Sequence, residues 1–243
     1  MEKIRLSKLM ASRGMCSRRE ADEWIARNLV RVDGEIVSTL GIRVSPDCSI
    51  SIEEKARRQQ RSLITVLLNK PVGYVSGQPE HGHLAASTLI VKSNHYRNDK
   101  IRYRGRTNHQ QRMAPAGRLD IDSQGLLILT QDGRIARRLI GQDCDIEKEY
   151  LVRVEGSINP MKLRLLRHGL ELDGRALKTA IVDEIEPKLL KFVLIEGRKR
   201  QIRRMCELVD LEVRSLKRVR IGRVKLAGLP RGEWRYLRAN ETF

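Results

Sequence analysis

Aromatic residues make up only 4% of this 243-residue chain, so its core must be largely aliphatic. No apolar run approaches the roughly 20 residues that span a bilayer. The start, MEKIRLSKLM, lacks the long apolar core of a signal peptide. The four cysteines are scattered, with no C-x-x-C pair and no nearby pair of histidines, which argues against a zinc site. We therefore expect a soluble cytoplasmic protein with reduced thiols.

Acidic residues are also in short supply, because 48 Lys and Arg face 30 Asp and Glu, a net charge of +18. An excess of this size and sign indicates a polyanionic partner, since each phosphate contact releases condensed counterions. No basic amphipathic anchor appears, so nucleic acid is favoured over a membrane surface.

Several common catalytic motifs are missing. The chain has no Walker loop, no G-x-G-x-x-G, no G-x-S-x-G and no H-E-x-x-H. The sequence therefore indicates neither nucleotide-driven nor metal-driven chemistry, and we expect no metal site.

The first sixty residues predict a compact module. Apolar residues at helical spacing are followed by Gly14, and Ser17 to Glu20 is a capping box that opens a second helix. Residues 30–37 alternate around Asp33-Gly34, the pattern of a hairpin, and residues 48–52 alternate again. The stretch RLSKLMASRGMCSRREADEWIARNLVRVDGEIV resembles the S4 RNA-binding domain.

The S4 resemblance implies that the two helices face structured RNA, which would make phosphate contacts of Arg5, Lys8, Arg13, Arg18 and Arg19. The alternative is that these residues are only the solvated faces of amphipathic helices. Residues 53–62 are polar without an apolar stripe and predict a linker, so we place an S4 domain at 1–61 and a second domain at 63–243.

The second domain has more predicted strands than helices and no regular βαβ order, which indicates an α+β fold with a mixed or antiparallel sheet. Strands are expected at 63–68, 126–130, 149–154, 180–185, 191–195, 213–221, 224–226 and 234–237, and helices at 134–140, 160–168 and 198–206. Lys70 precedes a Pro-Gly turn and is expected to be solvated or to touch RNA.

Residues 92–112 form an unusual basic stretch, with seven Lys or Arg against one Asp, a net of +6, and two interleaved tyrosines. Such a segment can hold phosphates and stack on unpaired bases. A surface loop without a specific role is the equally weighted alternative. His95 and His109 lie in this stretch without metal-ligand spacing.

The stretch GRLDIDSQGLLILT (117–130) places two carboxylates in a basic turn before an apolar strand. Functional groups are often held on loops at the ends of strands. An Asp beside an Arg is more often a structural ion pair than a reacting group, so the residues alone do not decide.

Family resemblance changes that weighting. GRLDIDSQGLLILT is very similar to the catalytic-loop motif of the RNA pseudouridine synthases, and the branch is the ribosomal RsuA/RluB/RluE/RluF family. KEYLVRV, GRKRQIRRMCE and LKRVRIG with LPRGEWRYL resemble its later motifs in the same order, and the RluF-type subgroup is the closest. The resemblance implies isomerisation of a uridine to pseudouridine, with no cofactor and no metal.

The same resemblance implies the roles of individual residues. Asp120 would act at the sugar as nucleophile or as base, Tyr150 would stack on the uracil, and Arg203 would pair with Asp120 and keep it ionised. Leu216 would form an apolar wall against the base, and Arg118 would help to open the duplex or hold the loop. Asp122 is expected to shape the turn.

The basic run 198–206 adds Arg198, Arg200 and Arg204 as expected RNA contacts. The implied partner is ribosomal RNA, 23S rather than 16S, with a tRNA as a possible second substrate, no membrane, and a monomeric enzyme. A non-catalytic S4 protein that binds ribosomal RNA during assembly is the alternative function.

Overall fold

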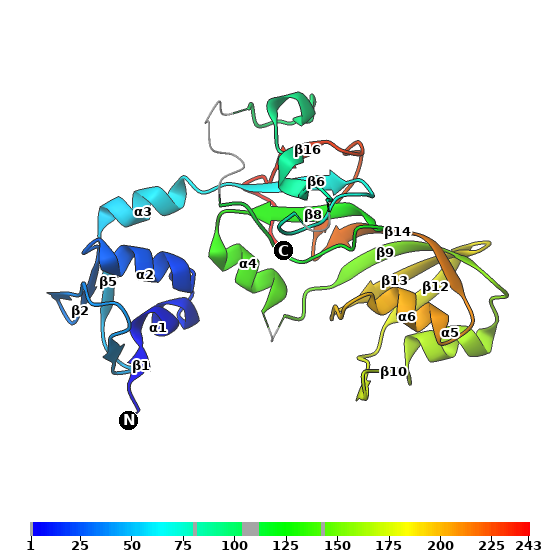
Figure 1. The fold of residues 1–243 in the computed structure, drawn as a ribbon, viewed down its shortest axis with the longest axis horizontal. Helices are drawn as coiled ribbons and strands as arrows, with labels where there is room; N and C mark the ends of the chain where they lie inside the picture. Colours follow the sequence, from blue (N-terminus) through cyan, green and yellow to red (C-terminus); the bar gives the residue numbers. More distant parts are fainter. Residues whose placement is uncertain (1, 80–81, 104–111, 142–143) are drawn as a thin grey trace.

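The computed structural model describes residues 2–79, 82–103, 112–141 and 144–243. In the view of Figure 1 an N-terminal module lies at one end and a large sheet fills the centre and the other end. Helix α3 (Glu54–Arg61) runs from the module to the first strand of the large sheet, β6 (Thr65–Lys70).

The N-terminal module packs two helices, α1 (Leu6–Ser12) and α2 (Arg18–Ala26), against short strands. The three-stranded sheet has the order β3-β2-β5, and β1 pairs with β4. The bounds of these strands are β1 Ile4–Arg5, β2 Val30–Val32, β3 Glu35–Ile36, β4 Arg43–Val44 and β5 Ile50–Ile52.

The capping box predicted at the start of α2 is confirmed. The Ser17 hydroxyl accepts from the Glu20 amide at 3.2 Å, and the Glu20 carboxylate accepts from the Ser17 amide at 2.8 Å. These bonds satisfy two amide donors that a helix start leaves without a partner. The apolar side chains of both helices, with Trp24 at the centre, then form a core separate from that of the large sheet.

The expected linker is helical over most of its length. Only Ala56 of α3 is buried, so no apolar stripe revealed the helix. Glu54 lies 3.6 Å from Arg58 and 3.6 Å from Arg61, at the helical spacing that brings side chains together.

The large sheet has nine strands and the order β12-β13-β9-β14-β8-β6-β16, with β15 beside β14 and β7 beside β8. All of its pairs are antiparallel except β14 with β8. The α+β class and the mixed sheet are confirmed. The strand bounds are β7 Ala114–Pro115, β8 Gln124–Thr130, β9 Lys148–Glu155, β12 Ile181–Glu186, β13 Leu189–Leu194, β14 Glu212–Ile221, β15 Val224–Lys225 and β16 Trp234–Tyr236.

Helices flank this sheet: α4 (Gly133–Ile140) follows β8, while α5 (Pro160–Arg167) and α6 (Gln201–Glu207) accompany the half made by β9, β12 and β13. Two 3₁₀ turns, at Ala86–Leu89 and Lys92–Asn94, and a hairpin of β10 (Glu171–Leu172) and β11 (Arg175–Ala176) complete the fold. Apolar residues alternate between two cores, so that Leu127 and Leu129 of β8 face one and Leu126 and Ile128 the other.

The parallel pair of β8 and β14 requires a glycine. Gly125 lies opposite Arg218 in the register, and a Cβ atom at Gly125 would be 2.3 Å from the carbonyl oxygen of Arg218. Its φ of +104° is also a conformation that residues with side chains rarely adopt. This glycine therefore allows the two strands to meet directly after the two carboxylates of the turn.

Candidate active site

The Asp120 loop (residues 117–123) enters β8 and is tied to the segment after β6. The Ser76 hydroxyl accepts from the Leu119 amide at 2.8 Å and donates to the Leu119 carbonyl at 2.7 Å. The Gly73 amide donates to the Ile121 carbonyl at 2.8 Å. Ser76 is buried, so these bonds fix the loop backbone on both sides of Asp120.

Asp120 itself is half-buried, and its carboxylate makes no hydrogen bond or ion pair with any residue that the structure describes. Its backbone carbonyl accepts from the Ser123 amide at 3.1 Å. A carboxylate held on a fixed loop and left without a partner is available to a substrate.

The predicted ion pair of Arg203 with Asp120 is wrong in this structure. The Arg203 guanidinium lies 3.2 Å from the Asp122 carboxylate and donates to the Asp122 carbonyl at 3.0 Å. Arg200 lies 3.1 Å from the same carboxylate. The turn at residues 121–122 presents both acceptor groups of Asp122 to the start of α6, where the two arginines stand three positions apart on one face.

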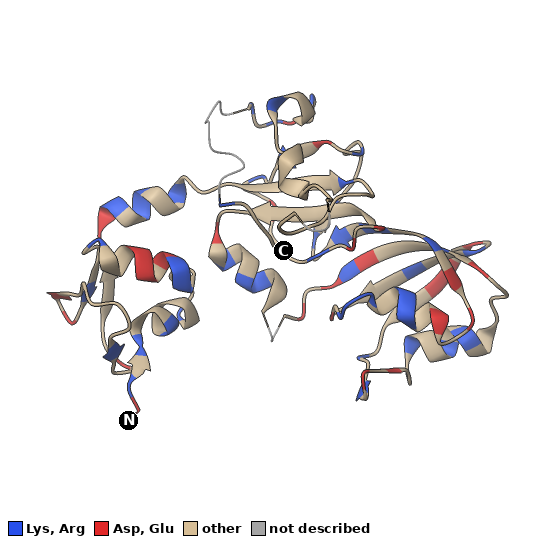
Figure 2. Cartoon of the chain, in the orientation of Figure 1, with Lys and Arg blue, Asp and Glu red and all other residues tan. Residues whose placement is uncertain are grey.

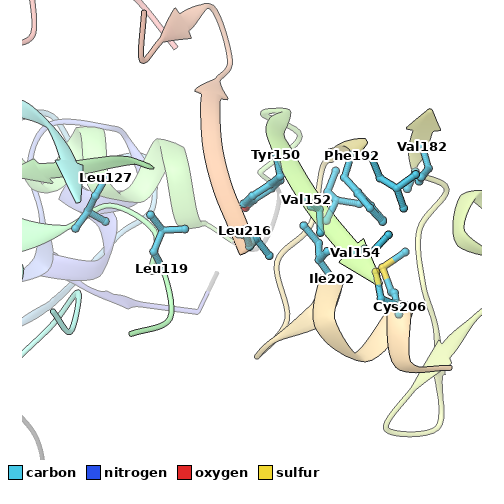
Figure 3. Packing of buried hydrophobic residues seen from close by; sticks show 14 of the residues in the cluster. Leu119, Leu127, Tyr150, Val152, Val154, Val182, Phe192, Ile202, Cys206 and Leu216 are labelled. Carbon is cyan, nitrogen blue, oxygen red and sulfur yellow. The ribbon is translucent and has the colours of Figure 1, made fainter. Parts of the chain in front are cut away.

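Tyr150 and Leu216, which were expected to contact the base, form an apolar wall in the core of the large sheet. Tyr150 on β9 is 8% exposed and Leu216 on β14 is 6% exposed, and both belong to the core cluster that also contains Leu119. Leu216 pairs with Val152, two residues beyond Tyr150 on the same face, so the two side chains lie beside each other (Figure 3). The wall therefore adjoins the Asp120 loop.

Arg218 is a site residue that the sequence reasoning missed. It is 2% exposed, its Nε donates to the Leu126 carbonyl at 2.8 Å, and its Nη1 donates to the Arg118 carbonyl at 3.2 Å. Its guanidinium carbon lies 6.0 Å from the centre of the Tyr150 ring. It therefore joins β14, the loop and the apolar wall.

A sequence signal for Arg218 was available. In a strand, residues two apart share a face, and Arg218 is two residues after Leu216. The Nη2 atom of Arg218 is buried and has no hydrogen-bond partner in the described part of the chain. A buried cation with a spare donor normally satisfies it through a partner or a ligand.

Lys70 is fully buried at the end of β6, so the expectation of a solvated or RNA-contacting side chain is wrong. Its ammonium donates to the Pro71 carbonyl at 2.9 Å and to the Tyr74 carbonyl at 2.8 Å. Burial lowers the pKa of Lys70 to about 8, against the opposing attraction of Asp122 and Asp120. The turn that follows β6 wraps around this ammonium, and the Asp120 loop lies within its electrostatic reach.

The basic residues expected to contact RNA fall into two groups. Arg198 donates to the carbonyls of Leu172, Arg175 and Ala176, and Arg204 forms a 2.6 Å ion pair with Asp173. With Arg200 on Asp122, these three arginines hold the β10–β11 hairpin and the Asp120 loop. Their side chains therefore bind other parts of the protein. The basic run in the sequence did not reveal these contacts, because their partners lie far away in the chain.

The side chain of Arg118 is exposed and has no partner among the described residues. In the N-terminal module, Arg13 donates to two backbone carbonyls and Arg5 lies 3.7 Å from Asp22. The other three residues of that module expected to contact RNA are exposed and form no ion pair with a described residue: Lys8, Arg18 and Arg19.

The N-terminal module touches the region after β8. The Arg137 guanidinium donates to the Ala11 carbonyl, and Arg134 donates to the Gln60 side chain at 3.0 Å. A Cβ atom at Gly133 would be 2.2 Å from the Ser17 side chain, so the start of α4 lies directly against the start of α2. Lys and Arg are frequent on both α3 and α4 (Figure 2).

Among the described residues, no group of three or more His, Cys, Asp or Glu is placed to hold a metal ion. None of the described helices is long and apolar enough to cross a membrane.

Comparison with known families gives two matches that together cover most of the chain. Residues 64–208 match the RNA pseudouridylate synthase family, and residues 4–47 match the S4 domain. The chain belongs to the RNA pseudouridylate synthase family, and it is an RNA-modifying enzyme with an N-terminal S4 domain.

Individual relatives agree with this assignment. The chain is 37% identical over 240 residues to the dual-specificity RNA pseudouridine synthase RluF of Escherichia coli strain K12, covering 98% of this chain and 77% of that protein. It is 34% identical to an uncharacterized RNA pseudouridine synthase of Aquifex aeolicus, covering 99% and 93%. A crystal structure of a pseudouridylate synthase superposes with a TM-score of 0.66 at 25% identity, covering 97% of this chain and 96% of that one.

Proposed function

We propose that this enzyme converts a specific uridine of ribosomal RNA, in the 23S molecule, to pseudouridine, and that Asp120 is the reacting group. The observation that carries the proposal is the contrast between two carboxylates of one turn. Asp122 is paired with Arg200 and Arg203, whereas the Asp120 carboxylate has no partner among the described residues. Ser76 fixes its loop near the Tyr150 and Leu216 wall.

The reaction needs no co-reactant. The C1′–N1 bond breaks, the uracil turns, and a C1′–C5 bond forms, while C5 loses a proton and N1 gains one. Asp120 acts at the sugar, either by attack on C1′ or by removal of a proton, and a carboxylate suits both roles. Tyr150 supplies a flat surface for the detached base, and its hydroxyl has no hydrogen-bond partner among the described residues.

The target base must leave its stack, which costs a few kcal/mol. The exposed Arg118, at the start of the loop, is placed to fill the space that the base vacates. Arg203 acts on the loop through Asp122 rather than by direct contact with Asp120. Leu216 closes the pocket behind the base with an apolar surface.

The N-terminal domain is proposed to occupy residues 1–61 and to bring the RNA to the catalytic domain at 63–243, with α3 as the connection. Lys8, Arg18 and Arg19 are the proposed phosphate contacts of this domain, because their side chains are exposed and form no ion pair within the described parts of the chain. We expect a monomeric enzyme that acts in the cytoplasm, where its RNA is found.

The test is pseudouridine mapping of ribosomal and transfer RNA from cells that lack the gene. Wild-type protein should restore the missing position, and Asp120→Asn should not. Asp122→Asn is the matched control, since it makes the same change two residues away and should restore the position at least in part. If every position persists in the deletion, ribosomal RNA is not the substrate; if Asp120→Asn restores it, Asp120 is not the reacting group.

The relative named as dual-specificity makes a second substrate worth measuring in the same cells. A position lost from a tRNA as well as from 23S RNA would extend the proposal. A position lost from tRNA alone would replace the ribosomal substrate.

A further inference from the structure

The first part of the basic stretch, residues 92–103, is a cationic surface whose charges have no acidic partners among the described residues. Its four basic side chains are exposed, and none forms an ion pair or hydrogen bond with a described residue: Lys92, Arg97, Lys100 and Arg102. The single acid of the segment, Asp99, has a fully buried side chain.

A buried anchor holds this segment. The His95 Nε2 atom lies 3.0 Å from the Asp99 carboxylate, and the side chains are 12% and 0% exposed. The same carboxylate accepts from the Tyr236 amide at 3.0 Å and from the Ile101 amide at 3.1 Å. The His95 ring packs 4.6 Å from the ring of Trp234. One acid thus joins both ends of the segment to strand β16.

Backbone bonds fix the same position. The Tyr96 amide donates to the Trp234 carbonyl at 2.8 Å, and the Trp234 indole donates to the Val91 carbonyl at 2.8 Å. Strand β16 pairs with β6, and β6 pairs with β8, which follows the Asp120 loop. Trp234, Ile90 and Leu119 belong to one core cluster. The backbone that carries the cations is therefore held on the same sheet as the Asp120 loop.

Buried contacts already order the backbone that carries these cations, so phosphate binding has to order only their side chains, which lack counter-charges among the described residues. A membrane is a poor fit, because none of the exposed large hydrophobic residues lies in this segment. We propose that residues 92–103 form a second RNA-backbone contact of this enzyme, positioned by the His95–Asp99 anchor and separate from the S4 domain. The inference rests on the proposed action on RNA and adds a binding surface to it.

The test compares two triple variants of the full-length protein with equal loss of charge. Arg97→Gln with Lys100→Gln and Arg102→Gln removes the proposed contact. The control set, with exposed residues away from the segment, is Arg164→Gln, Arg175→Gln and Lys178→Gln. Filter binding of in vitro transcribed Escherichia coli 23S RNA over a range of salt gives the slope of log affinity against log salt concentration.

The first triple variant should reduce that slope by about 2–3, because each duplex phosphate contact contributes about 0.9 and each single-strand contact about 0.7. The control should leave the slope within about 1 of wild type. Equal slopes for wild type and the first variant, or equal losses for both triples, would overturn the inference. So would loss of binding to vesicles of anionic phospholipid with unchanged RNA affinity.

His95→Ala tests the anchor without a change of the exposed cations. We expect RNA affinity to fall and KM to rise more than kcat falls, and His95→Gln, which keeps a donor for Asp99, to recover part of the affinity. Normal affinity in a folded His95→Ala protein would refute the positioning role. Because these are binding measurements, they remain informative if no pseudouridine is formed, which would count against the proposed function alone.

Discussion

Replacement of Arg218 by Met should damage both stability and turnover. The change keeps most of the side-chain volume but leaves the carbonyls of Leu126 and Arg118 without their buried donors, at 2.8 and 3.2 Å in the native protein. Each unsatisfied buried group costs about 1–3 kcal/mol. The variant no longer has to bury a charged guanidinium, which offsets part of this loss. We therefore expect the free energy of unfolding to fall by about 2–4 kcal/mol.

Turnover should fall by more than RNA binding, because Arg218 holds the Asp120 loop from within, whereas the proposed RNA contacts are exposed cations elsewhere in the chain. Urea unfolding gives the stability, and tritium release from RNA labelled at uridine C5 gives kcat and KM. Arg218→Lys should rescue poorly, since an ammonium cannot reproduce the two directions of the guanidinium fork.

The matched control lies on the same strand. Arg214 is exposed and pairs with Glu212 at 2.8 Å, and an exposed pair of this kind contributes about 0–1 kcal/mol. If Arg218→Met unfolds at the same urea concentration as Arg214→Met and turns over normally, the positioning role assigned to Arg218 is refuted.

Three further predictions concern the backbone at Gly125, the proton of Lys70 and the thiol groups of two cysteines. Gly125→Ala should lower the free energy of unfolding, measured in urea, by at least about 2 kcal/mol. Gly77→Ala should change the urea midpoint of unfolding little, because an added Cβ atom at Gly77 would have no neighbour within 4 Å. Burial lowers the pKa of Lys70 from 10.5 to about 8, so between these pH values the unfolded chain keeps the Lys70 proton and the folded chain does not. The free energy of unfolding of the wild type, relative to that of Lys70→Met, should therefore rise with pH across this window by up to about 3 kcal/mol. A difference that does not change with pH would contradict this. Burial raises the pKa of Cys206 to about 12, so iodoacetamide at pH 8 should label the partly exposed Cys144 first, as peptide mass spectrometry would show.

Local patterns predicted the elements well because their causes are local. The capping box at Ser17, the Asp33-Gly34 hairpin and the alternation of β9 and β14 each depend on residues a few positions apart. Helix α3 was missed because Ala56 is its one buried residue, so its sequence has no apolar stripe. A hydrophobic pattern does not report such a helix.

The site was only partly predictable, for a tertiary reason. Motif resemblance selected Asp120, Tyr150 and Leu216, and the structure brings their segments to one core cluster. It could not show which carboxylate Arg203 would reach, because that depends on how the turn faces α6. The burial of Lys70 and Arg218 was hidden for the same reason, since long cationic side chains are normally expected at the surface.

The parallel pair of β8 and β14 has a consequence for the order of folding. The hydrogen bond between Arg218 and the Leu126 carbonyl joins residues 92 positions apart in the sequence. The loop that carries Asp120 is therefore held by β14, a strand that is synthesised late. Contacts so distant in sequence form late, and a chain emerging from the ribosome offers its N-terminal part first. The N-terminal S4 domain can therefore be complete while the loop that carries Asp120 is still unsupported. During synthesis, the S4 domain of this enzyme should therefore fold and be able to bind RNA before the catalytic domain is active.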